Sequence, residues 1–170
     1  MDFAAYVRDI KDFPKPGVTF KDITPLLKNP EALKKASDAL CSFTTNMKID
    51  KVVGVDSRGF IFAPILAERL NAGFVPVRKK GKLPYKTVSE AYELEYGSEV
   101  LEIHTDAIKK GEKVLIHDDV LATGGTASAV CKLVEQLGGE VVQCNFLVEL
   151  TFLNGAEKLN GYQIEALLQY

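Results

Sequence analysis

The sequence predicts an α/β fold in which a central, mostly parallel sheet is flanked by helices. Three observations predict it. Short apolar runs, typical of buried strands, alternate along the chain with segments of helical periodicity. Two of these runs, ending at Val55 and Ile116, are each followed by an acidic residue, a glycine-containing turn and a helical pattern. The 170 residues are 46% hydrophobic, enough for one domain with a substantial core. Strands that alternate with helices are usually joined by parallel crossovers.

The N-terminal segment has the least regular pattern. Residues 2–11 are expected to form a helix. Residues 13–27 contain Pro14, Pro16 and Pro25, and we expect this stretch to be irregular because proline lacks the amide donor that helices and central strands use.

From residue 31 onward, helical and strand patterns alternate. Residues 88–103 alternate in polarity, which predicts an extended hairpin that turns around Glu95, Tyr96 and Gly97. No repeat or linker interrupts the chain, so residues 1–170 are expected to form a single domain. The expected helices cover residues 31–46, 60–70, 105–110, 127–137 and 155–159, and the expected strands cover residues 51–55, 74–77, 114–116, 141–149 and 163–168.

Composition excludes several classes of protein. The chain has 21 basic and 23 acidic residues, a net charge of −2, which argues against a protein that coats nucleic acid. No apolar run reaches the roughly 18 residues that a membrane span requires. The N-terminus carries charges among its apolar residues, unlike a signal peptide.

The cysteines indicate a reducing compartment. Cys41, Cys131 and Cys144 are odd in number and widely spaced, so neither a disulfide framework nor a zinc-binding pattern emerges. We interpret them as small buried thiols and expect a cytoplasmic protein.

The most informative segment is VLIHDDVLATGGT, residues 114–126. An apolar strand pattern ends at Asp118 and Asp119, and a small-residue turn with Gly124 and Gly125 then opens a helical pattern. Glycines let the backbone turn tightly and approach a ligand, and amides at a helix start attract phosphate. Ionised aspartates accept hydrogen bonds from sugar hydroxyls. The segment therefore predicts a ribose 5-phosphate site, although a similar turn and acidic pair also occur in tight connections and solvated loops.

Two further segments carry cations that suit a second anionic group. Arg58 lies in GVDSRGF, which repeats the order of strand, acidic residue, glycine and helix, and its guanidinium could bind an anion through two hydrogen bonds. A surface arginine in a turn is an equally common reading. The basic segment RKKGKLPYK contains Arg78, Lys79 and Lys82, and is typical either of a mobile arm that neutralises pyrophosphate or of a solvated loop.

Residues 114–126 closely resemble the phosphoribosyl diphosphate-binding signature of the type I phosphoribosyltransferases. That signature has apolar residues, two acidic residues, a few small or apolar residues, and then TGGT or a close variant. The chain departs from it at His117, a position that is usually apolar. We expect His117 to flank the site without a catalytic role.

The resemblance extends over nearly the whole chain and is greatest to members of the family that act on adenine. Six segments carry it in order: DFPKPGVTFKDITPLL, VDSRGFIFAP, VRKKGKLPYKT, YELEYGSEVLEIH, VLIHDDVLATGGT and FLVELTFL. It implies transfer of the phosphoribosyl group from phosphoribosyl diphosphate to adenine, giving AMP and pyrophosphate, in purine salvage. It also implies Mg²⁺ bound mainly through substrate and water, a hood from about residues 1–30, a flexible loop at about residues 79–100, and a homodimer.

The resemblance also implies roles for individual residues. Glu95 corresponds to the general acid/base on the hairpin, although the residues alone favour one more exposed charge. A cis peptide bond is implied between Asp56 and Ser57. The family commonly has Val and Arg in place of Thr19 and Lys21, a departure that affects base specificity more than reaction class. The implied contacts are the 5-phosphate with Ala122, Thr123, Gly124, Gly125 and Thr126, the ribose with Asp118 and Asp119, pyrophosphate with Arg58, Arg78, Lys79 and Lys82, and the base with Val18, Thr19, Phe20, Lys21 and Leu150.

Two other functions stay open at this point. A regulatory protein of the same fold would sense phosphoribosyl diphosphate and bind nucleic acid, but the net charge of −2 and the hood segment disfavour it. A phosphoribosyltransferase for hypoxanthine, guanine or xanthine would share the phosphate and ribose sites and differ only in the base that it accepts.

Overall fold

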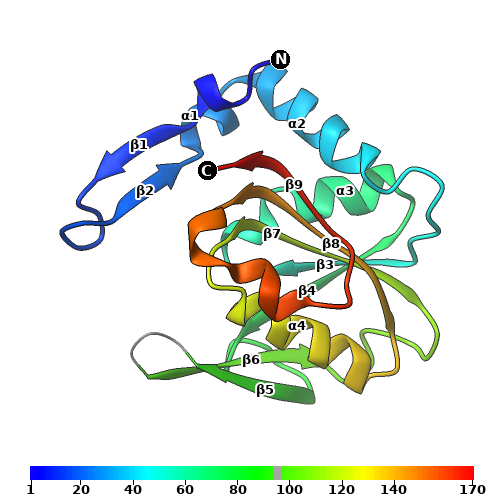
Figure 1. Ribbon diagram of the computed structural model, residues 1–170. Coiled ribbons are helices and arrows are strands. Elements are labelled where there is room, and N and C mark those ends of the chain that lie inside the picture. Colours follow the sequence, from blue (N-terminus) through cyan, green and yellow to red (C-terminus); the bar gives the residue numbers. More distant parts are fainter. Residues whose placement is uncertain (94–96) are drawn as a thin grey trace. The chain divides into compact units, whose positions relative to one another are not determined.

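The structure is a computed structural model that describes residues 1–93 and 97–170 (Figure 1). The chain divides into two compact units, residues 1–39 and residues 40–170. None of the helices in the described ranges has the length and apolar character that crossing a membrane requires.

The first unit contains a two-stranded antiparallel sheet and short helices. Ion pairs join the strands at Arg8–Asp22, 2.9 Å, and at Lys21–Asp9, 2.8 Å. The elements in order are η1 (Ala4–Tyr6), β1 (Arg8–Lys11), β2 (Thr19–Asp22), α1 (Thr24–Leu27) and the start of α2 (Pro30–Ser42), which continues into the second unit.

Two predictions for this unit are wrong. The helix expected over residues 2–11 is a single 3₁₀ turn followed by β1. Residues 13–27 are not irregular throughout, because β2 and α1 lie within them. The physical reason is that β1 and β2 stabilise each other through backbone pairs between distant residues, such as Arg8 with Asp22, which a local pattern does not record. The expected helix over residues 31–46 is confirmed as α2, which ends earlier, at Ser42.

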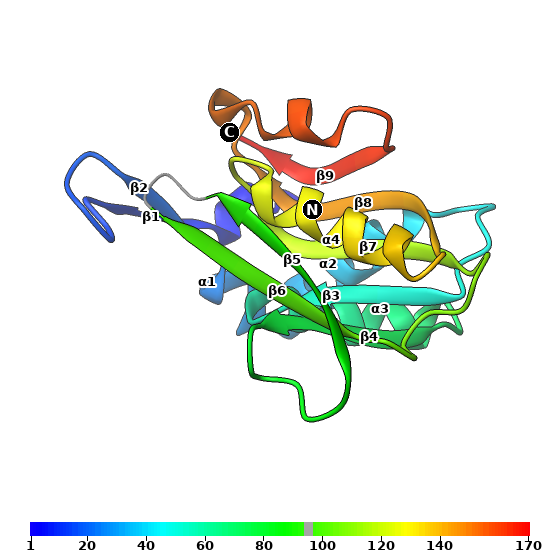
Figure 2. The ribbon, with the colours of Figure 1, turned by 90° about the horizontal axis from the view of Figure 1, so that it is seen from below.

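The second unit is built on a seven-stranded sheet in the order β5-β6-β4-β3-β7-β8-β9. Five neighbouring strands of this sheet are parallel, namely β4, β3, β7, β8 and β9. The β5–β6 hairpin adds two strands along one edge, where β6 pairs antiparallel with both β5 and β4, as Figure 2 shows. The mostly parallel sheet and the antiparallel pairing of the hairpin strands are therefore confirmed, while Glu95 and Tyr96 of the expected turn lie outside the described residues. The strands are β3 (Lys51–Val55), β4 (Gly73–Lys79), β5 (Thr87–Glu93), β6 (Ser98–His104), β7 (Lys113–Leu121), β8 (Glu140–Glu149) and β9 (Ile164–Gln169).

The helical connections leave the middle of this sheet in opposite directions. Helix α3 (Ala63–Arg69) joins β3 to β4, and α4 (Gly125–Gln136) joins β7 to β8 on the other side of the β3–β7 pair. Right-handed crossovers that run in opposite directions place their helices on opposite faces of the sheet, in agreement with Figure 1. The carboxyl ends of β3 and β7 therefore form the switch point at which such sheets bind ligands.

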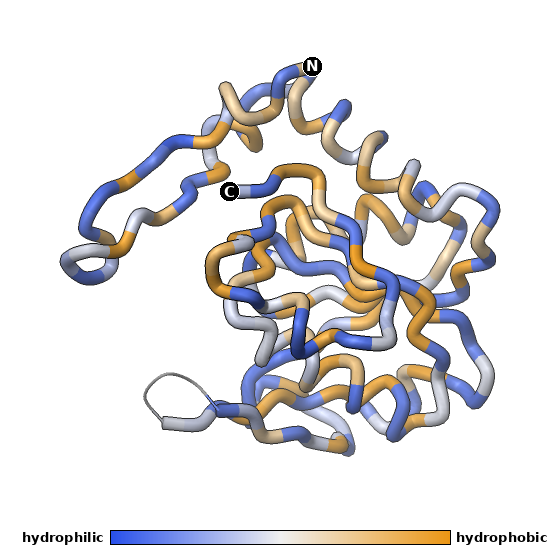
Figure 3. Tube along the Cα trace, in the orientation of Figure 1, coloured by the Kyte–Doolittle hydropathy of each residue, from blue (hydrophilic) through white to orange (hydrophobic). Residues whose placement is uncertain are grey.

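The central strands are buried on both faces. Val53 of β3 and Ile116 of β7 are register partners, are fully buried and pack in one core cluster with Val130 of α4. Their chain neighbours Val52 and Leu115 point to the opposite face and are also fully buried. Figure 3 shows the resulting hydrophobic colouring along the central strands. Burial on both faces explains why these strands appear in the sequence as continuous apolar runs.

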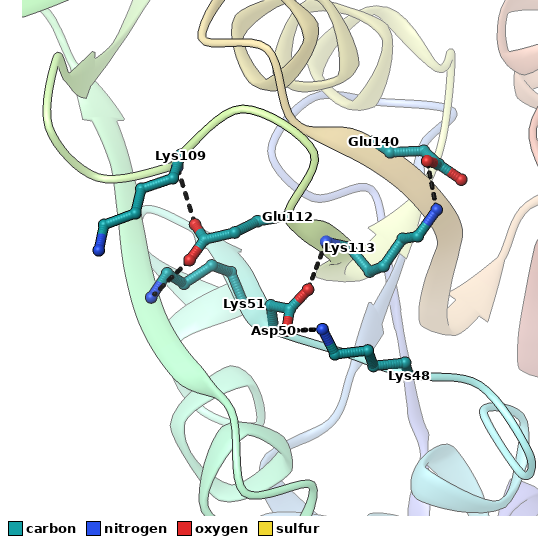
Figure 4. Close-up of polar contacts among 7 residues, drawn as sticks. All are labelled: Lys48, Asp50, Lys51, Lys109, Glu112, Lys113 and Glu140. Carbon is teal, nitrogen blue, oxygen red and sulfur yellow. Dashed lines mark hydrogen bonds and ion pairs between the residues drawn. The ribbon is translucent and has the colours of Figure 1, made fainter.

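A network of charged side chains lies at the amino-terminal edge of the sheet, opposite the switch point (Figure 4). Asp50 accepts a hydrogen bond from the backbone amide of Lys113, 2.8 Å, and pairs with Lys48, 2.9 Å. Lys51 pairs with Glu112 at 3.5 Å. Contacts of Lys113 with Glu140 and of the Lys109 amide with Glu112 complete the network and join the starts of β3, β7 and β8.

Two helix predictions in the second unit need correction. Residues 105–110 form turns and bends, in which the Lys109 amide donates to the Glu112 side chain. The helix expected over residues 60–70 is divided into η2 (Arg58–Phe60) and α3, with Pro64 in the first turn of α3. The segment Gly155–Leu159 is helical as expected but is a 3₁₀ helix, η4.

Candidate active site

The turn that follows β3 and the carboxyl-terminal part of β7 border one pocket at the switch point. Its volume is about 280 Å³. Contributions come from the β3 turn, from β4, from the β5–β6 hairpin, from β7 and from the first turn of α4. The lining residues are Val55, Asp56, Ser57, Arg58, Lys79, Tyr92, Glu99, Leu101, Asp118, Asp119 and Thr126.

A smaller pocket of about 70 Å³ adjoins it at the start of α4 and shares Asp118 and Thr126 as lining residues. Gly124 is the N-cap residue of α4, with a φ of 77°, and as a glycine it has no side chain to cap the first turn. Uncapped amides at a helix start, together with the helix dipole, attract an anion. The pocket also takes in Ala122 and Thr123, so it suits a phosphate monoester.

The two glycines of this turn differ in what they require. Gly124 has the left-handed backbone that disfavours side chains, whereas Gly125 is the first residue of α4 and has no positive φ. The tight turn that the sequence predicted at the pair therefore depends on Gly124.

Asp118 and Asp119 lie inside β7 rather than beyond its end. The strand was expected over residues 114–116 and in fact continues to Leu121. Backbone pairing with β8 extends it, since Asp118 pairs with Phe146 and Leu121 with Glu149. Successive residues of a strand point to opposite faces, but both carboxyl groups still line the pocket because the pocket lies at the sheet edge.

Burial dominates the electrostatics of the aspartate pair. It raises the pKa of Asp118 well above its ordinary value, and the neighbouring Asp119 carboxylate raises it further. Burial also raises the pKa of Asp119, while Arg58 opposes the shift. Asp119 Oδ2 lies 2.9 Å from Arg58 Nε, but among the described residues no aligned hydrogen-bond donor reaches this buried oxygen. It is an acceptor suited to a ligand hydroxyl.

The four cations expected near pyrophosphate lie in two groups. Arg58 and Lys79 line the larger pocket, and Arg78 and Lys82 do not. Lys79 Nζ pairs with Glu99 Oε1 at 2.6 Å. Arg78 Nε pairs with Asp56 at 2.8 Å and its Nη1 donates to the Lys82 carbonyl oxygen at 3.2 Å. The side chains of Arg58, Lys79 and Arg78 are thus each in contact with a carboxylate.

The polar side chains that the hairpin adds to the pocket were missed by the sequence analysis. Tyr92 and Glu99 are cross-strand partners on β5 and β6, and the Tyr92 hydroxyl donates to Glu99 Oε2 at 2.7 Å. Burial raises the pKa of Tyr92, and the hydrogen bonds from Lys79 and Tyr92 lower the pKa of Glu99. The alternation of the hairpin, which was recognised, could have placed both side chains on one face.

The remaining expected site residues are not brought into this pocket by the described structure. Glu95 lies outside the described residues. Leu150 is half-buried and follows β8. The four expected base-binding residues belong to the first unit: Val18, which is half-buried, and Thr19, Phe20 and Lys21 of β2, where Phe20 makes an edge-to-face contact with Phe13 and Lys21 pairs with Asp9.

His117 is fully buried beside the aspartate pair. Its Nδ1 lies 2.7 Å from Asn145 Oδ1 and its ring lies edge-on to Phe62. Burial lowers the pKa of His117 to about 4, so the ring is neutral at physiological pH. A neutral imidazole fits the usually apolar position because it adds no charge next to Asp118. The cis peptide bond expected between Asp56 and Ser57 is present.

Across the described residues, no three His, Cys, Asp or Glu side chains gather closely enough to hold a metal ion. Cys131 and Cys144 are buried free thiols with their sulfur atoms 3.6 Å apart, and Cys41 is half-buried.

Comparisons with known proteins agree on one family. Residues 22–159 match the family model of the phosphoribosyl transferase domain. The chain is 65% identical to the adenine phosphoribosyltransferase of Christiangramia forsetii over 170 residues, covering 100% of this chain and 99% of that protein. The crystal structure of the Rhodothermus marinus adenine phosphoribosyltransferase is 54% identical with a TM-score of 0.95, over 99% of this chain and 96% of that one.

A third relative was solved with ligands. The Saccharomyces cerevisiae adenine phosphoribosyltransferase, in complex with an imino-altritol bisphosphate and adenine, is 44% identical with a TM-score of 0.94, over 98% of this chain and 97% of that one. Identity at this level over the full length goes beyond a shared fold. The chain therefore belongs to the phosphoribosyltransferase family and, within it, to the adenine phosphoribosyltransferases.

Proposed function

We propose that this protein transfers the 5-phosphoribosyl group of phosphoribosyl diphosphate to adenine and releases pyrophosphate, making AMP in purine salvage. One observation carries the proposal: an uncapped helix start, a buried aspartate pair and two cations border contiguous pockets at the switch point of the sheet. Together these groups match the phosphate, the diol and the diphosphate of this substrate. Membership of the family and the adenine bound in the yeast relative support the choice of base.

The 5-phosphate binds at the start of α4 in this proposal. Ala122, Thr123, Gly124 and Thr126 line the smaller pocket and present backbone amides and two hydroxyl groups to the phosphate. Gly125 does not line that pocket and contributes the first amide of α4. The ribose hydroxyls then donate to Asp118 and Asp119. The Asp119 Oδ2 acceptor gains the donor that it lacks among the described residues, which offsets part of its desolvation.

The pyrophosphate group binds on the Arg58 side of the pocket. Arg58 and Lys79 exchange their carboxylate partners for phosphate oxygens, and Arg78 and Lys82 contribute from the adjoining loop. Preorganised cations stabilise the negative charge that develops on the leaving group.

The pocket fits a magnesium ion carried by the substrate. Asp118 and Asp119 border the pocket with carboxylate oxygens, which can accept hydrogen bonds from the waters that a protein-bound Mg²⁺ usually keeps. When bound, the ion neutralises part of the diphosphate charge. We assign no protein side chain as its direct ligand, since substrate and water provide most of the shell in this proposal.

The reaction is a substitution at the anomeric carbon with oxocarbenium character. The bond from this carbon to the pyrophosphate oxygen breaks, and an imidazole nitrogen of adenine forms the new bond. The attacking nitrogen loses its proton as this bond forms, and Glu95, as the general acid/base, takes part in that transfer. The family resemblance supports the role of Glu95 in this proposal. It also supports a cytoplasmic location, a homodimer and contacts of the base with Val18, Thr19, Phe20, Lys21 and Leu150.

A panel of bases tests the proposed function. Purified protein with phosphoribosyl diphosphate and Mg²⁺ is assayed with adenine, hypoxanthine, guanine and xanthine, and nucleotide and pyrophosphate are measured. We expect AMP and pyrophosphate in equal amounts with adenine, and much slower turnover with the other bases. Faster turnover with a 6-oxopurine would show that adenine is not the preferred base. Absence of turnover with every base would contradict the proposed transferase activity.

A second variant tests the role of Glu95. General acid/base catalysis typically contributes about 10²–10⁴-fold, so Glu95→Gln is expected to lower kcat by a factor in this range. The KM for phosphoribosyl diphosphate is expected to change little, because the glutamate acts on the base. Unchanged kcat in the variant would rule out this role.

A further inference from the structure

Gly155, at the start of η4, lies directly against the turn that precedes α4. A Cβ atom on Gly155 would lie 2.2 Å from the Ala122 carbonyl oxygen and 3.0 Å from the Gly124 amide nitrogen. A Cβ atom on Gly124 would in turn lie 2.2 Å from the Gly155 carbonyl oxygen. The two backbone segments are therefore in contact with no room for a side chain on either side.

The reason for glycine at position 155 is space alone. Gly155 is not among the residues with positive φ, so its backbone conformation is open to any L-residue. Gly124 differs, because it has a φ of 77° as well as the close contact. Alanine at position 155 would thus add a steric conflict with the turn and no conformational strain of its own.

Helix η4 is anchored and does not offer an easy way to relieve that conflict. Gly155 is buried, and Leu159 at the other end of η4 is fully buried in the core cluster that also contains α4 residues. Ala156 packs against the same cluster. The turn at residues 122–124 has a partly exposed side and borders open pocket space, so it is the segment that would move.

We propose that Gly155 is a positioning residue for binding of the 5-phosphate. Its lack of a side chain lets the backbone of Ala122 and Gly124 adopt the conformation in which the amides before α4 face the phosphate. Gly155 does not line either pocket and acts only through that turn. This inference rests on the proposed function, because it assumes that the turn binds the phosphate of a phosphoribosyl group.

Gly155→Ala tests the proposal, with Gly161→Ala as the matched control. Gly161 lies in the same segment, has a φ of 98° and has open space where a Cβ atom would lie, so its substitution strains the backbone without touching the turn. Ribose 5-phosphate and pyrophosphate are titrated separately by calorimetry, and thermal unfolding is recorded for each variant. Gly155→Ala is expected to raise the Kd for ribose 5-phosphate by roughly tenfold or more, the loss that one charge-assisted hydrogen bond implies, with pyrophosphate affinity unchanged.

The control separates positioning from general loss of stability. Gly161→Ala is expected to keep wild-type affinity for ribose 5-phosphate even where it melts at a lower temperature than the wild type. Wild-type affinity in Gly155→Ala would overturn the proposal. Equal loss of affinity in both variants would also overturn it, because the effect would then follow from stability alone.

A second pair of variants applies if Gly155→Ala does not fold. Leu159→Val shortens the buried side chain that anchors η4, and Leu66→Val makes the same change at a fully buried position of α3. Weaker binding of ribose 5-phosphate is expected only for Leu159→Val. Wild-type affinity in Leu159→Val would contradict the proposal. The wild-type titration separates failure of this inference from failure of the proposed function. A wild-type protein that does not bind ribose 5-phosphate would refute the proposed function regardless of Gly155.

Discussion

At the scale of single residues, the aspartate pair of β7 suits ligand binding at a cost to the stability of the unliganded fold. Burial raises the pKa of both carboxyl groups, and the Asp119 carboxylate raises that of Asp118 further. Backbone hydrogen bonds and Arg58 oppose these shifts without cancelling them. Hydrophobic or amide side chains would suit the same space with less cost. Such an arrangement is typical of a site whose ligand supplies the missing donors.

Asp118→Asn is therefore expected to stabilise the unliganded protein and impair its activity. The folded-state pKa of Asp118 lies above its ordinary value of 3.8, so the folded protein holds this proton more tightly than the unfolded chain. The contribution of the group to the free energy of unfolding accordingly falls as pH rises through the raised pKa. Asparagine removes this dependence and can still accept the Asp119 amide hydrogen bond, which measures 2.9 Å to Asp118 Oδ1.

Thermal unfolding between pH 4 and pH 8 measures this effect, with the exposed Asp106→Asn as the control. Asp118→Asn is expected to melt above the wild type at pH 7, by an amount that shrinks toward acidic pH, while its KM for phosphoribosyl diphosphate rises. A melting temperature below that of the wild type at pH 7 would show that the buried Asp118 carboxyl group does not destabilise the folded protein.

We expect the Glu99 carboxylate to compete with the substrate for Lys79. Glu99→Gln removes the carboxylate at 2.6 Å from Lys79 Nζ and keeps an acceptor for the Tyr92 hydroxyl. An exposed ion pair is worth about 0.2–1 kcal/mol, so the KM for phosphoribosyl diphosphate is expected to fall by roughly 1.5- to 5-fold at low salt.

The matched control for this variant is Glu90→Gln. Glu90 lies on the same hairpin outside the pocket, and the change breaks its ion pair with Lys132 of α4, 3.1 Å. It is expected to leave the KM unchanged. The difference between the variants should shrink as ionic strength rises, because salt screens both pairs. A KM that rises in Glu99→Gln would mean that the carboxylate helps to bind the substrate.

At the scale of elements, the two edges of the sheet have separate tasks. The carboxyl edge carries the pockets, and the amino edge carries the charged network that joins β3, β7 and β8. The separation predicts that substitutions at the amino edge change stability and leave catalysis alone.

Asp50→Ala tests that separation. A backbone hydrogen bond from Lys113 is the main cause of a lowered pKa for Asp50, and Lys48 adds to it. A lowered folded-state pKa means that the stabilisation is present above 3.8 and is lost as pH falls through the folded value. Asp50→Ala is therefore expected to lower the melting temperature at pH 7 by several degrees, less in acid, with kcat unchanged.

Lys48→Ala is the control for the ion-pair part of this contribution. The Lys48 side chain is 77% exposed, so its removal is expected to change stability by at most about 0.5 kcal/mol. A reduced kcat in Asp50→Ala, measured with the protein fully folded, would contradict the division of tasks between the two edges.

The element scale also shows where local patterns fail. The central strands β3 and β7 of the second unit were predicted because burial on both faces requires a continuous apolar run in the sequence. Strand β1 was not, since its residues are mostly exposed and its pairing with β2 comes from non-local hydrogen bonds. The full length of β7 was missed for a related reason, because pairing with β8 holds polar residues in strand conformation.

At the scale of the whole molecule, ligand binding is expected to stabilise the chain in a metal-dependent way. Phosphoribosyl diphosphate with Mg²⁺ at about 100 times its Kd adds about 2.7 kcal/mol to the free energy of unfolding. For a domain of this size that corresponds to a rise of roughly 5–10 °C in melting temperature. EDTA is expected to remove most of the rise for phosphoribosyl diphosphate and little of it for AMP, which has no diphosphate to bridge.

Differential scanning fluorimetry with the two ligands, with and without EDTA, measures these shifts. Ribose without phosphate is the control and is expected to cause no shift. An EDTA-insensitive rise with phosphoribosyl diphosphate would show that the protein side chains alone neutralise the diphosphate, and would contradict the proposed place of the metal.

The sequence alone determined the fold class, the strand-to-helix motif at residues 114–126 and the type of ligand it suits, because hydrophobic periodicity and turn chemistry act over a few neighbouring residues. Only the tertiary structure decided which distant groups share that site. The contacts of Glu99 with Lys79 and Tyr92, and the contact of Gly155 with the phosphate turn, join residues on different elements. Such contacts depend on how the strands and helices pack, and no local pattern encodes that packing.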